Sequence, residues 1–261
     1  MFYCARMSES QIAIPAATIV LYRQTETGPA EHLMIERTAQ MVFAAGALVF
    51  PGGRIEADDH AIAADPALAV NAPVDAEDAA GRVAAIRETI EEVGIAVGVV
   101  PAPLATTIAA WRAALKAHQP LRPLLIASGS QLDLADLVPF ARWRPKLLAH
   151  RLFDTRFYVA LCPDLADAAH DTDEAAQHVW LTAEAAIAAD DAGHHSMLFP
   201  TRRNVERLAL YPRFADVLAH VAVTKPQIIT PWFDEIDGKP CLRIPEDAGY
   251  PVTSAAVPPR I

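Results

Sequence analysis

The sequence has few cysteines, and their number and placement restrict the chemistry open to it. The three cysteines, Cys4, Cys162 and Cys241, are far apart and odd in number. They therefore predict neither a disulfide framework nor a paired cysteine metal motif. Unpaired thiols are typical of a reducing compartment, so we expect a cytoplasmic protein.

Long apolar runs and an excess of positive charge are also missing. The longest apolar stretch, residues 93–115, is interrupted by Pro101, Pro103 and Arg112, and the first ten residues lack the pattern of a secretory signal; no membrane partner is expected. The formal net charge is −10, which disfavours binding to the nucleic-acid backbone. An acidic protein can still bind an anionic ligand when a metal ion mediates the contact.

What the 261 residues do contain is enough apolar sequence for a core, with strands and helices interspersed. Residues 16–23 and 32–37 have the β-branched and apolar composition of a strand hairpin, and residues 44–50 predict a third strand. Residues 153–162 and 178–181 predict two more strands, and Asp237-Gly238 divides a C-terminal hairpin over 227–244.

Five segments are expected to be helical, namely 79–93, 105–118, 132–137, 183–189 and 202–210, the last two with Thr182 and Thr201 near their N-caps. Residues 54–78 have no clear period and are interpreted as an insertion or long loop. The expected architecture is an α/β (α+β) sandwich with helices outside a central sheet. We assign residues 10–223 to the main domain and 224–261 to a C-terminal hairpin and tail.

The segment that indicates chemistry is Arg87-Glu88-Thr89-Ile90-Glu91-Glu92, inside the helix predicted to end at Gly94. Residues three and four apart share a helix face, so Glu88 lies one turn before Glu91 and Glu92. Carboxylates this close repel each other, whereas a hard cation such as Mg²⁺ or Mn²⁺ would bind them. A solvated acidic helix face is the alternative, since glutamate is a good helix former.

A glycine pair supports the metal interpretation. Gly52 and Gly53 directly follow the third predicted strand, where bare backbone can approach a ligand or metal closely. Strand, Gly-Gly turn and carboxylate helix together predict a site for a metal–diphosphate complex.

These residues resemble the motif of the Nudix hydrolases, G-x5-E-x7-R-E-U-x-E-E-x-G-U, where U is bulky and apolar. Arg87, Glu88, Glu91, Glu92 and Gly94 match its second half, with Thr89 at the first U position, and Gly53 matches its first residue. Gly53 and Arg87 are 34 positions apart where the continuous motif has 14, which leaves 20 extra residues. Asp59 stands at the position of the first motif glutamate, and Glu56 and Glu77 are the other candidates for that acid.

An insertion within this motif, after the sequence VFPGG, is similar to one branch of the family that includes peroxisomal enzymes hydrolysing coenzyme A and its thioesters. The segments at 151–158, 174–186 and 199–208 are also similar to that branch. The resemblance implies a Nudix-like α/β/α sandwich with a mixed central sheet, whose insertion lies at about residues 54–78.

The resemblance also implies roles for individual residues. Glu88, Glu91, Glu92 and the Gly52 carbonyl would hold Mg²⁺ or Mn²⁺, Arg87 would orient the glutamates, and Glu91 and Glu174 are the candidates for the general base. Gly53, Glu174, Arg202 and Arg203 are candidate substrate-binding residues, because arginine forms bidentate contacts with phosphate. An ordinary helix start with surface arginines is the alternative for Arg202 and Arg203. Trp143, interpreted as a packing residue, could also stack an adenine.

The predicted function is metal-dependent hydrolysis of the diphosphate linkage in a nucleoside diphosphate-X substrate, with coenzyme A or an acyl-CoA as the leading candidate. One alternative substrate is another nucleotide conjugate, such as ADP-ribose, NADH or capped RNA. A second alternative is a nucleotide-sensing domain of the same fold without turnover. The expected partner is a small nucleotide diphosphate; a homodimer is left open.

Overall fold

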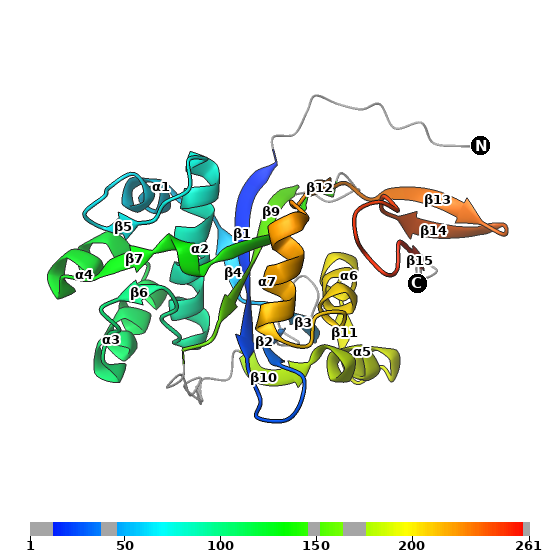
Figure 1. Ribbon diagram of the computed structural model, residues 1–261, viewed down its shortest axis with the longest axis horizontal. Coiled ribbons are helices and arrows are strands. Elements are labelled where there is room, and N and C mark those ends of the chain that lie inside the picture. The colour runs from blue at the N-terminus through cyan, green and yellow to red at the C-terminus, as the bar shows by residue number, and fades with distance from the viewer. Residues whose placement is uncertain (1–12, 38–45, 146–151, 164–175, 258–261) are drawn as a thin grey trace.

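The protein is built on a central sheet that is covered by helices on both faces (Figure 1). The computed structural model describes residues 13–37, 46–145, 152–163 and 176–257. Within them, helices α1 to α4 lie on one side of the sheet and α5 to α7 on the other. The α+β sandwich predicted from the sequence is confirmed.

Over the described residues, the central sheet has nine strands and mixes parallel and antiparallel pairs. Its order is β11-β3-β2-β1-β9-β8-β12, with β10 paired to β2 and β4 paired to β1. The long strand β1 is antiparallel to β2 and parallel to β9, so the predicted N-terminal hairpin and mixed sheet are both present. The strands are β1 (Ile14–Arg23), β2 (Glu31–Arg37), β3 (Ala47–Val49), β4 (Gly52–Arg54), β8 (Val138–Trp143), β9 (Phe153–Leu161), β10 (Ala176–Thr182), β11 (Ser196–Met197) and β12 (Ile228–Ile229).

Side chains of β1 alternate between two hydrophobic cores, one on each face of the sheet. Ile19 and Leu21 belong to the first core, which contains the buried face of α2, whereas Val20 and Tyr22 belong to the second, which contains residues of α6 and α7. Because successive side chains of a strand point to opposite faces, α2 and α6 lie on opposite faces of the sheet.

The first face carries four helices and a small sheet of its own. The helices are α1 (Ala57–Ala63), α2 (Ala76–Val93), α3 (Ala105–Lys116) and α4 (Leu121–Ser128). The small sheet has the order β5-β7-β6, from β5 (Ala69–Val70), β7 (Gln131–Asp133) and β6 (Val99–Val100), and the 3₁₀ turn Leu134–Asp136 follows β7.

Two expectations for this face need correction. Of the two interpretations of residues 54–78, the long loop is wrong, because the stretch contains α1, β5 and the first turn of α2, whereas the insertion stays a prediction. Helix α1 buries only Asp59 and Ile62, which leaves too few apolar positions to produce a visible helical period. The helix expected at 132–137 is instead β7 followed by a 3₁₀ turn, since Leu132 pairs with β5 and β6 rather than continuing a helix. Helix α4, which precedes it, was not predicted.

The second face carries α5 (Ala183–Asp191), α6 (Phe199–Leu208) and α7 (Phe214–Val223), of which α7 was not predicted. The hydroxyl of Thr182 accepts a hydrogen bond from the Ala185 amide at 3.1 Å, so its predicted N-cap role is confirmed. Thr201 is not an N-cap, because α6 begins before it, at Phe199, and Leu198 is the N-cap residue.

The C-terminal segment forms β13 (Trp232–Ile236), β14 (Lys239–Arg243) and β15 (Ser254–Ala256). Asp237 and Gly238 both have positive φ, 50° and 74°, as the predicted two-residue hairpin turn requires. Ile244 and Tyr250 are buried in the second core, so part of this segment packs on the main body.

Cys162 and Cys241 are buried thiols that form no disulfide, and Cys4 lies outside the described residues. None of the helices in the described ranges is both long and apolar enough to cross a membrane.

We predict that Gly81→Ala destabilises the protein although alanine favours helices. A Cβ on Gly81 would lie 2.5 Å from the Tyr158 hydroxyl, and overpacking of this kind costs about 1–3 kcal/mol. The double variant with Tyr158→Phe removes the clashing oxygen and serves as the matched control. Chemical denaturation measures the free energy of unfolding. Gly81→Ala should lower it less in the Tyr158→Phe background than in the unaltered protein. An equal loss in both backgrounds would refute the packing argument.

Candidate active site on the carboxylate helix

Helix α2 is closed at both ends by polar contacts, which fixes the position of its last turn. The Asp75 carboxylate accepts a hydrogen bond from the Glu77 amide at 3.0 Å, and Gly94 ends the helix with a left-handed φ of 70°. At the C-terminus, the guanidinium of Arg112 in α3 donates to the carbonyls of Glu91 and Glu92 at 3.1 and 2.6 Å. No sequence pattern predicted the contact from Arg112.

The two glycines of β4 lie directly against the carboxylates of α2. The Gly52 amide donates to the Glu92 carboxylate at 2.9 Å. A Cβ on Gly53 would collide with the carboxylate of Glu88, and one on Gly52 with the Ala17 carbonyl and with Thr18. Only glycine therefore lets this strand pair with β1 and touch α2 at the same time.

A buried ion pair ties α1 to α2. The Arg87 side chain donates from Nε and one terminal nitrogen to both carboxylate oxygens of Asp59, at 2.9 and 3.0 Å. Burial disfavours the charged guanidinium, but the hydrogen bonds and charge of Asp59 raise the pKa of Arg87 overall. A further bond reaches the Arg54 carbonyl at 2.8 Å. Arg87 therefore holds α1, β4 and α2 together.

This geometry identifies Asp59 as the acid in contact with Arg87, a choice that the sequence left open. Asp59 is fully buried and also accepts a hydrogen bond from the Glu56 amide at 2.8 Å. Glu77 lies at the other end of α2, 3.9 Å from His60, and Glu56 precedes α1 as its N-cap. The shorter aspartate reaches Arg87 because the start of α1 is folded against α2.

Thr89 occupies a position where the motif has an apolar residue, and its surroundings explain how it is accommodated. The side chain is fully buried, and its hydroxyl donates to the Ala85 carbonyl of the preceding turn at 2.6 Å. With its one polar group satisfied within the helix, Thr89 can pack like an aliphatic residue.

The glutamates are partly buried and lie beside one another, which opposes their ionisation. Burial raises the pKa of Glu88, Arg87 opposes the rise, and Glu91 and Asp59 add to it by repulsion. Burial also raises the pKa of Glu91; Arg87 and His118 oppose this rise and Glu56 adds to it. Arg87 lies 2.7 Å from the Glu88 carboxylate but 3.8 Å from that of Glu91. Its guanidinium therefore offsets the repulsion between the two carboxylates only in part.

The donor set has the chemistry that Mg²⁺ or Mn²⁺ requires, since it offers several carboxylate oxygens on one turn beside bare backbone. Among the described residues, no three Asp, Glu, His or Cys side chains are grouped closely enough to hold a metal ion. Glu88 faces Arg87 and Glu92 faces the Gly52 amide, so coordination would need these side chains to turn toward a common point. By donor chemistry the residues fit a hard divalent cation.

The other predicted residues that the structure describes lie away from this turn. Arg202 and Arg203 are on α6, on the opposite face of the sheet (Figure 1), where Arg202 pairs with Asp190 and Glu206 and Arg203 pairs with Glu206. Glu174 lies outside the described residues. Trp143 is 1% exposed and its indole N–H donates to the Tyr250 hydroxyl at 2.9 Å, so it is a packing residue and cannot stack an adenine.

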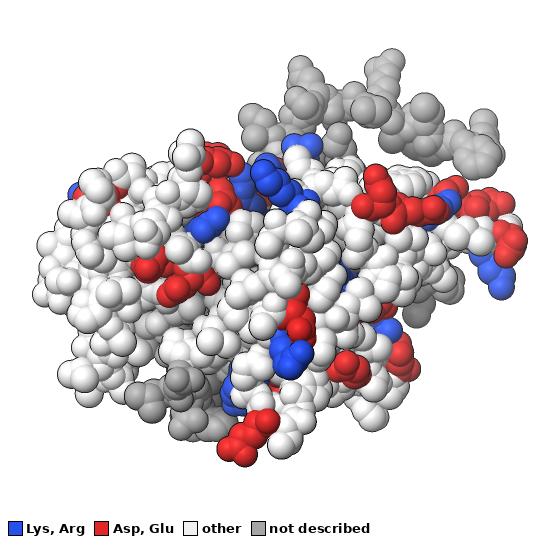
Figure 2. Space-filling view, in the orientation of Figure 1, with Lys and Arg blue, Asp and Glu red and all other residues white. Residues whose placement is uncertain are grey.

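Among the described residues, charged side chains are spread in small groups of both signs over the face seen in Figure 2.

Comparison with solved structures identifies the fold. A NUDIX hydrolase from Alicyclobacillus acidocaldarius is 27% identical, with a TM-score of 0.70 over 81% of this chain and 97% of the other. An Ap4A hydrolase from C. elegans has 17% identity and a TM-score of 0.34 over 70% and 90% of the two chains. The NUDIX domain of Shewanella oneidensis NrtR, complexed with ADP ribose, has 12% identity and a TM-score of 0.37 over 76% and 86%. No family model and no curated protein sequence matches.

The fold is therefore that of the Nudix hydrolases. This conclusion rests on the Alicyclobacillus acidocaldarius structure, because the other two structures are too distant to support an argument. The similarity to that structure agrees with the predicted enzyme class, a hydrolase acting on phosphoric anhydrides.

We predict that Asp59→Ala destabilises the protein by about 3 kcal/mol, because removing one partner of a buried pair leaves a buried charge poorly compensated. Asp58→Ala is the matched control: the Asp58 carboxylate accepts only an exposed hydrogen bond from the Arg122 amide, and its loss should cost about 1 kcal/mol or less. Urea denaturation measures both. Similar losses in the two variants would show that the Arg87–Asp59 pair does not stabilise the fold.

Proposed function

We propose that the protein hydrolyses the diphosphate linkage of a nucleoside diphosphate-X substrate with the help of Mg²⁺ or Mn²⁺. The observation that carries the proposal is the contact of Gly52 and Gly53 with the carboxylates of Glu92 and Glu88. It places bare backbone against two carboxylates of one helical turn, which would turn toward a common point to hold a cation bridging to a diphosphate. Glu88, Glu91, Glu92 and the Gly52 carbonyl are the proposed ligands.

Each residue of the site has a distinct part in this proposal. A bound divalent cation would activate water and neutralise charge on the phosphate oxygens. Arg87 acts as a positioning residue, because it holds Glu88 at 2.7 Å while it is itself fixed by Asp59. Gly53, which has no Cβ, lets the Glu88 carboxylate lie against β4 and is a proposed substrate-binding residue. Glu91, whose side chain is 26% exposed, and Glu174 remain the two candidates for the general base.

Substrate identity rests on resemblance alone. Coenzyme A or an acyl-CoA is the leading candidate, because the chain is similar to the branch that carries an insertion in the motif. Hydrolysis would release 3′,5′-ADP and a phosphopantetheine product. ADP-ribose, NADH and capped RNA remain alternatives, as does a sensing domain without turnover. In the proposal, residues 10–223 form the catalytic domain, residues 54–78 are the insertion, and residues 224–261 are an appended segment.

Localisation and assembly also remain predictions. A cytoplasmic location is expected from the small, odd number of widely separated cysteines. The sequence left a homodimer open. Strand β13 would be available for contact with a second copy, because its five residues are all exposed.

We predict that Glu92→Gln lowers turnover more than about 100-fold while the fold is retained. The glutamine side-chain carbonyl can still accept the Gly52 hydrogen bond, but the negative charge is lost. The assay measures phosphate or nucleotide release from coenzyme A, acyl-CoA, ADP-ribose, NADH and capped RNA, with Mg²⁺, Mn²⁺ or a chelator. Glu77→Gln, at the exposed start of α2, is the matched control and should be fully active.

Each outcome of this panel is informative. A preference for coenzyme A supports the branch assignment, whereas a preference for another conjugate replaces it. Binding without release by the unaltered protein would favour the sensing domain, and unchanged turnover in Glu92→Gln would exclude this site.

We further predict that divalent metal affinity weakens on acidification, beginning above the ordinary glutamate pKa of about 4.3. The metal binds the carboxylate form, and burial raises the pKa of Glu88 and Glu91. Protons therefore displace the metal at a higher pH than at an exposed glutamate. Calorimetric titration with Mn²⁺ over a pH series measures this, with the Glu88→Gln/Glu91→Gln variant as a non-binding control. No heat at saturating metal, with or without a pyrophosphate compound, would contradict the metal site.

A further inference from the structure

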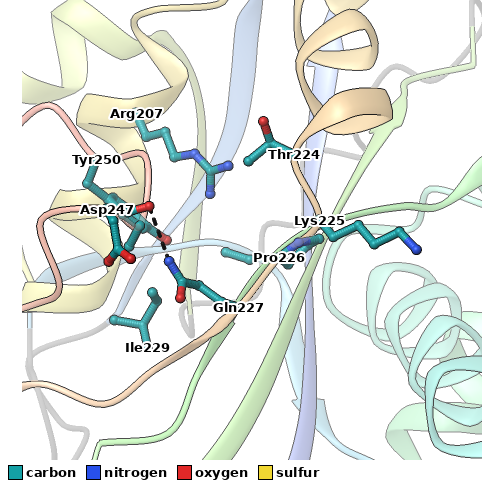
Figure 3. Close-up of a pocket in the computed structure, with 10 residues that line it drawn as sticks. Arg207, Thr224, Lys225, Pro226, Gln227, Ile229, Asp247 and Tyr250 are labelled. Atoms are coloured by element: carbon teal, nitrogen blue, oxygen red, sulfur yellow. Dashed lines mark hydrogen bonds between the residues drawn. The ribbon is translucent and has the colours of Figure 1, made fainter.

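A cavity on the second face of the sheet lies far from the carboxylate helix in the fold. It has a volume of about 120 Å³ and lies where the connection between α7 and β12 meets the C-terminal segment near Tyr250. Figure 3 shows its lining, with Arg207 of α6 on one side and residues of the connection on the other. The lining includes the side chains of Arg207, Thr224, Pro226, Gln227, Asp247 and Tyr250.

The buried charged group in this lining is Arg207, which is only 2% exposed. Its terminal nitrogens contact the Phe140 carbonyl at 3.1 Å and His220 Nε2 at 2.8 Å, and its Nε has no hydrogen-bond partner. None of the described carboxylates forms an ion pair with it, in contrast to Arg87, Arg202 and Arg203 on the same chain. Figure 3 shows its guanidinium pointing into the space in front of Pro226.

Neighbouring groups compensate this charge only in part. The guanidinium lies over the rings of Phe140 and Tyr250, 4.3 and 5.1 Å from their centroids, and such contacts offset part of the desolvation. Burial and the charge of Arg207 lower the pKa of His220, so the imidazole is a neutral acceptor. The Tyr250 hydroxyl contacts the Trp143 indole, Asn204 and Arg207, and because burial raises its pKa it supplies no negative charge.

The two charged residues at the rim do not neutralise Arg207 either. Asp247 also lines the cavity, but its carboxylate is not within ion-pair distance of Arg207 among the described residues; its backbone carbonyl accepts a hydrogen bond from the Gln227 side-chain amide at 3.3 Å. Lys225 points its ammonium group away from the cavity (Figure 3). The result is a buried guanidinium without a carboxylate partner beside a cavity, and a buried charge without a counter-ion costs free energy.

We propose that this cavity binds a compact oxyanion, the phosphate group of inorganic phosphate or of a small phosphorylated compound, through Arg207. Guanidinium groups bind phosphate oxygens through a planar fork of N–H donors, and Figure 3 shows the terminal nitrogens of Arg207 turned toward the cavity. Drug-sized ligands occupy pockets of roughly 300–1,000 Å³. The smaller cavity therefore accepts a phosphate group and leaves any attached nucleoside outside.

This anion site is separate from the proposed active site. Arg207 belongs to α6 and its surroundings to the second core, whereas Glu88, Glu91 and Glu92 project from α2 on the other face of the sheet. The anion site makes no use of a metal, so it can be tested in the presence of a chelator, and the test is independent of the proposed hydrolase activity.

The test is calorimetric titration of the metal-free protein with inorganic phosphate and, separately, with AMP. Gln227→Glu places a carboxylate in the cavity lining with almost no change in size and should weaken phosphate binding at least about tenfold. Gln119→Glu, an exposed position between α3 and α4, makes the same change in net charge away from the cavity and should change affinity by about twofold or less. Arg207→Lys keeps the charge but loses the fork and should also weaken binding.

The outcomes separate the alternatives. Saturable phosphate binding that Gln227→Glu weakens and Gln119→Glu does not supports the site; AMP binding of equal strength identifies the phosphate group of a larger compound as a ligand. If Arg207→Lys does not fold, the glutamine variants still decide the question. Absence of saturable phosphate binding, or an equal loss of phosphate affinity in the two glutamine variants, overturns the proposal. The cavity would then be a site for water only.

Discussion

The ion pair between Arg87 and Asp59 is the interaction on which the geometry of the candidate active site depends. It joins α1 to α2, and the same guanidinium also contacts the Arg54 carbonyl at the end of β4 and the Glu88 carboxylate. One side chain therefore fixes the distance between the glycine strand and the acidic turn. A buried pair like this adds little net stability on average, but it is costly to break, which makes it suited to holding a precise arrangement.

The acidic turn shows how the surroundings make crowded carboxylates tolerable. Glu92 is bound to the Gly52 amide and Glu88 to Arg87, while Glu91 is held more loosely. Arg112 closes the helix end by binding the last carbonyls, so the turn cannot unwind to relieve the repulsion. The repulsion that remains between the carboxylates would be relieved by a divalent cation bound among their oxygens.

The arginines of α6 illustrate why residue type alone does not assign a binding role. Arg202 and Arg203 follow a proline and a threonine in a pattern that suits phosphate binding, yet both are paired with carboxylates of α5 and α6. Arg207 lies in no recognisable motif, and it is the buried arginine of this helix without a carboxylate partner among the described residues. Whether an arginine of α6 has a carboxylate within ion-pair distance depends on how the helices pack. The order of residues along α6 does not reveal it.

Short-range patterns were enough to predict the mixed sandwich, the N-terminal and C-terminal hairpins, and the acidic turn with its Gly94 cap, because these features depend on neighbours within a few positions. The folded chain was needed to establish that Asp59 is the partner of Arg87, that Arg112 closes α2, and that residues 54–78 contain a helix. The two arginine contacts join residues that are 28 and 20 positions apart and meet through packing. Local patterns carry no information on such contacts, since they arise from how the helices settle on the sheet.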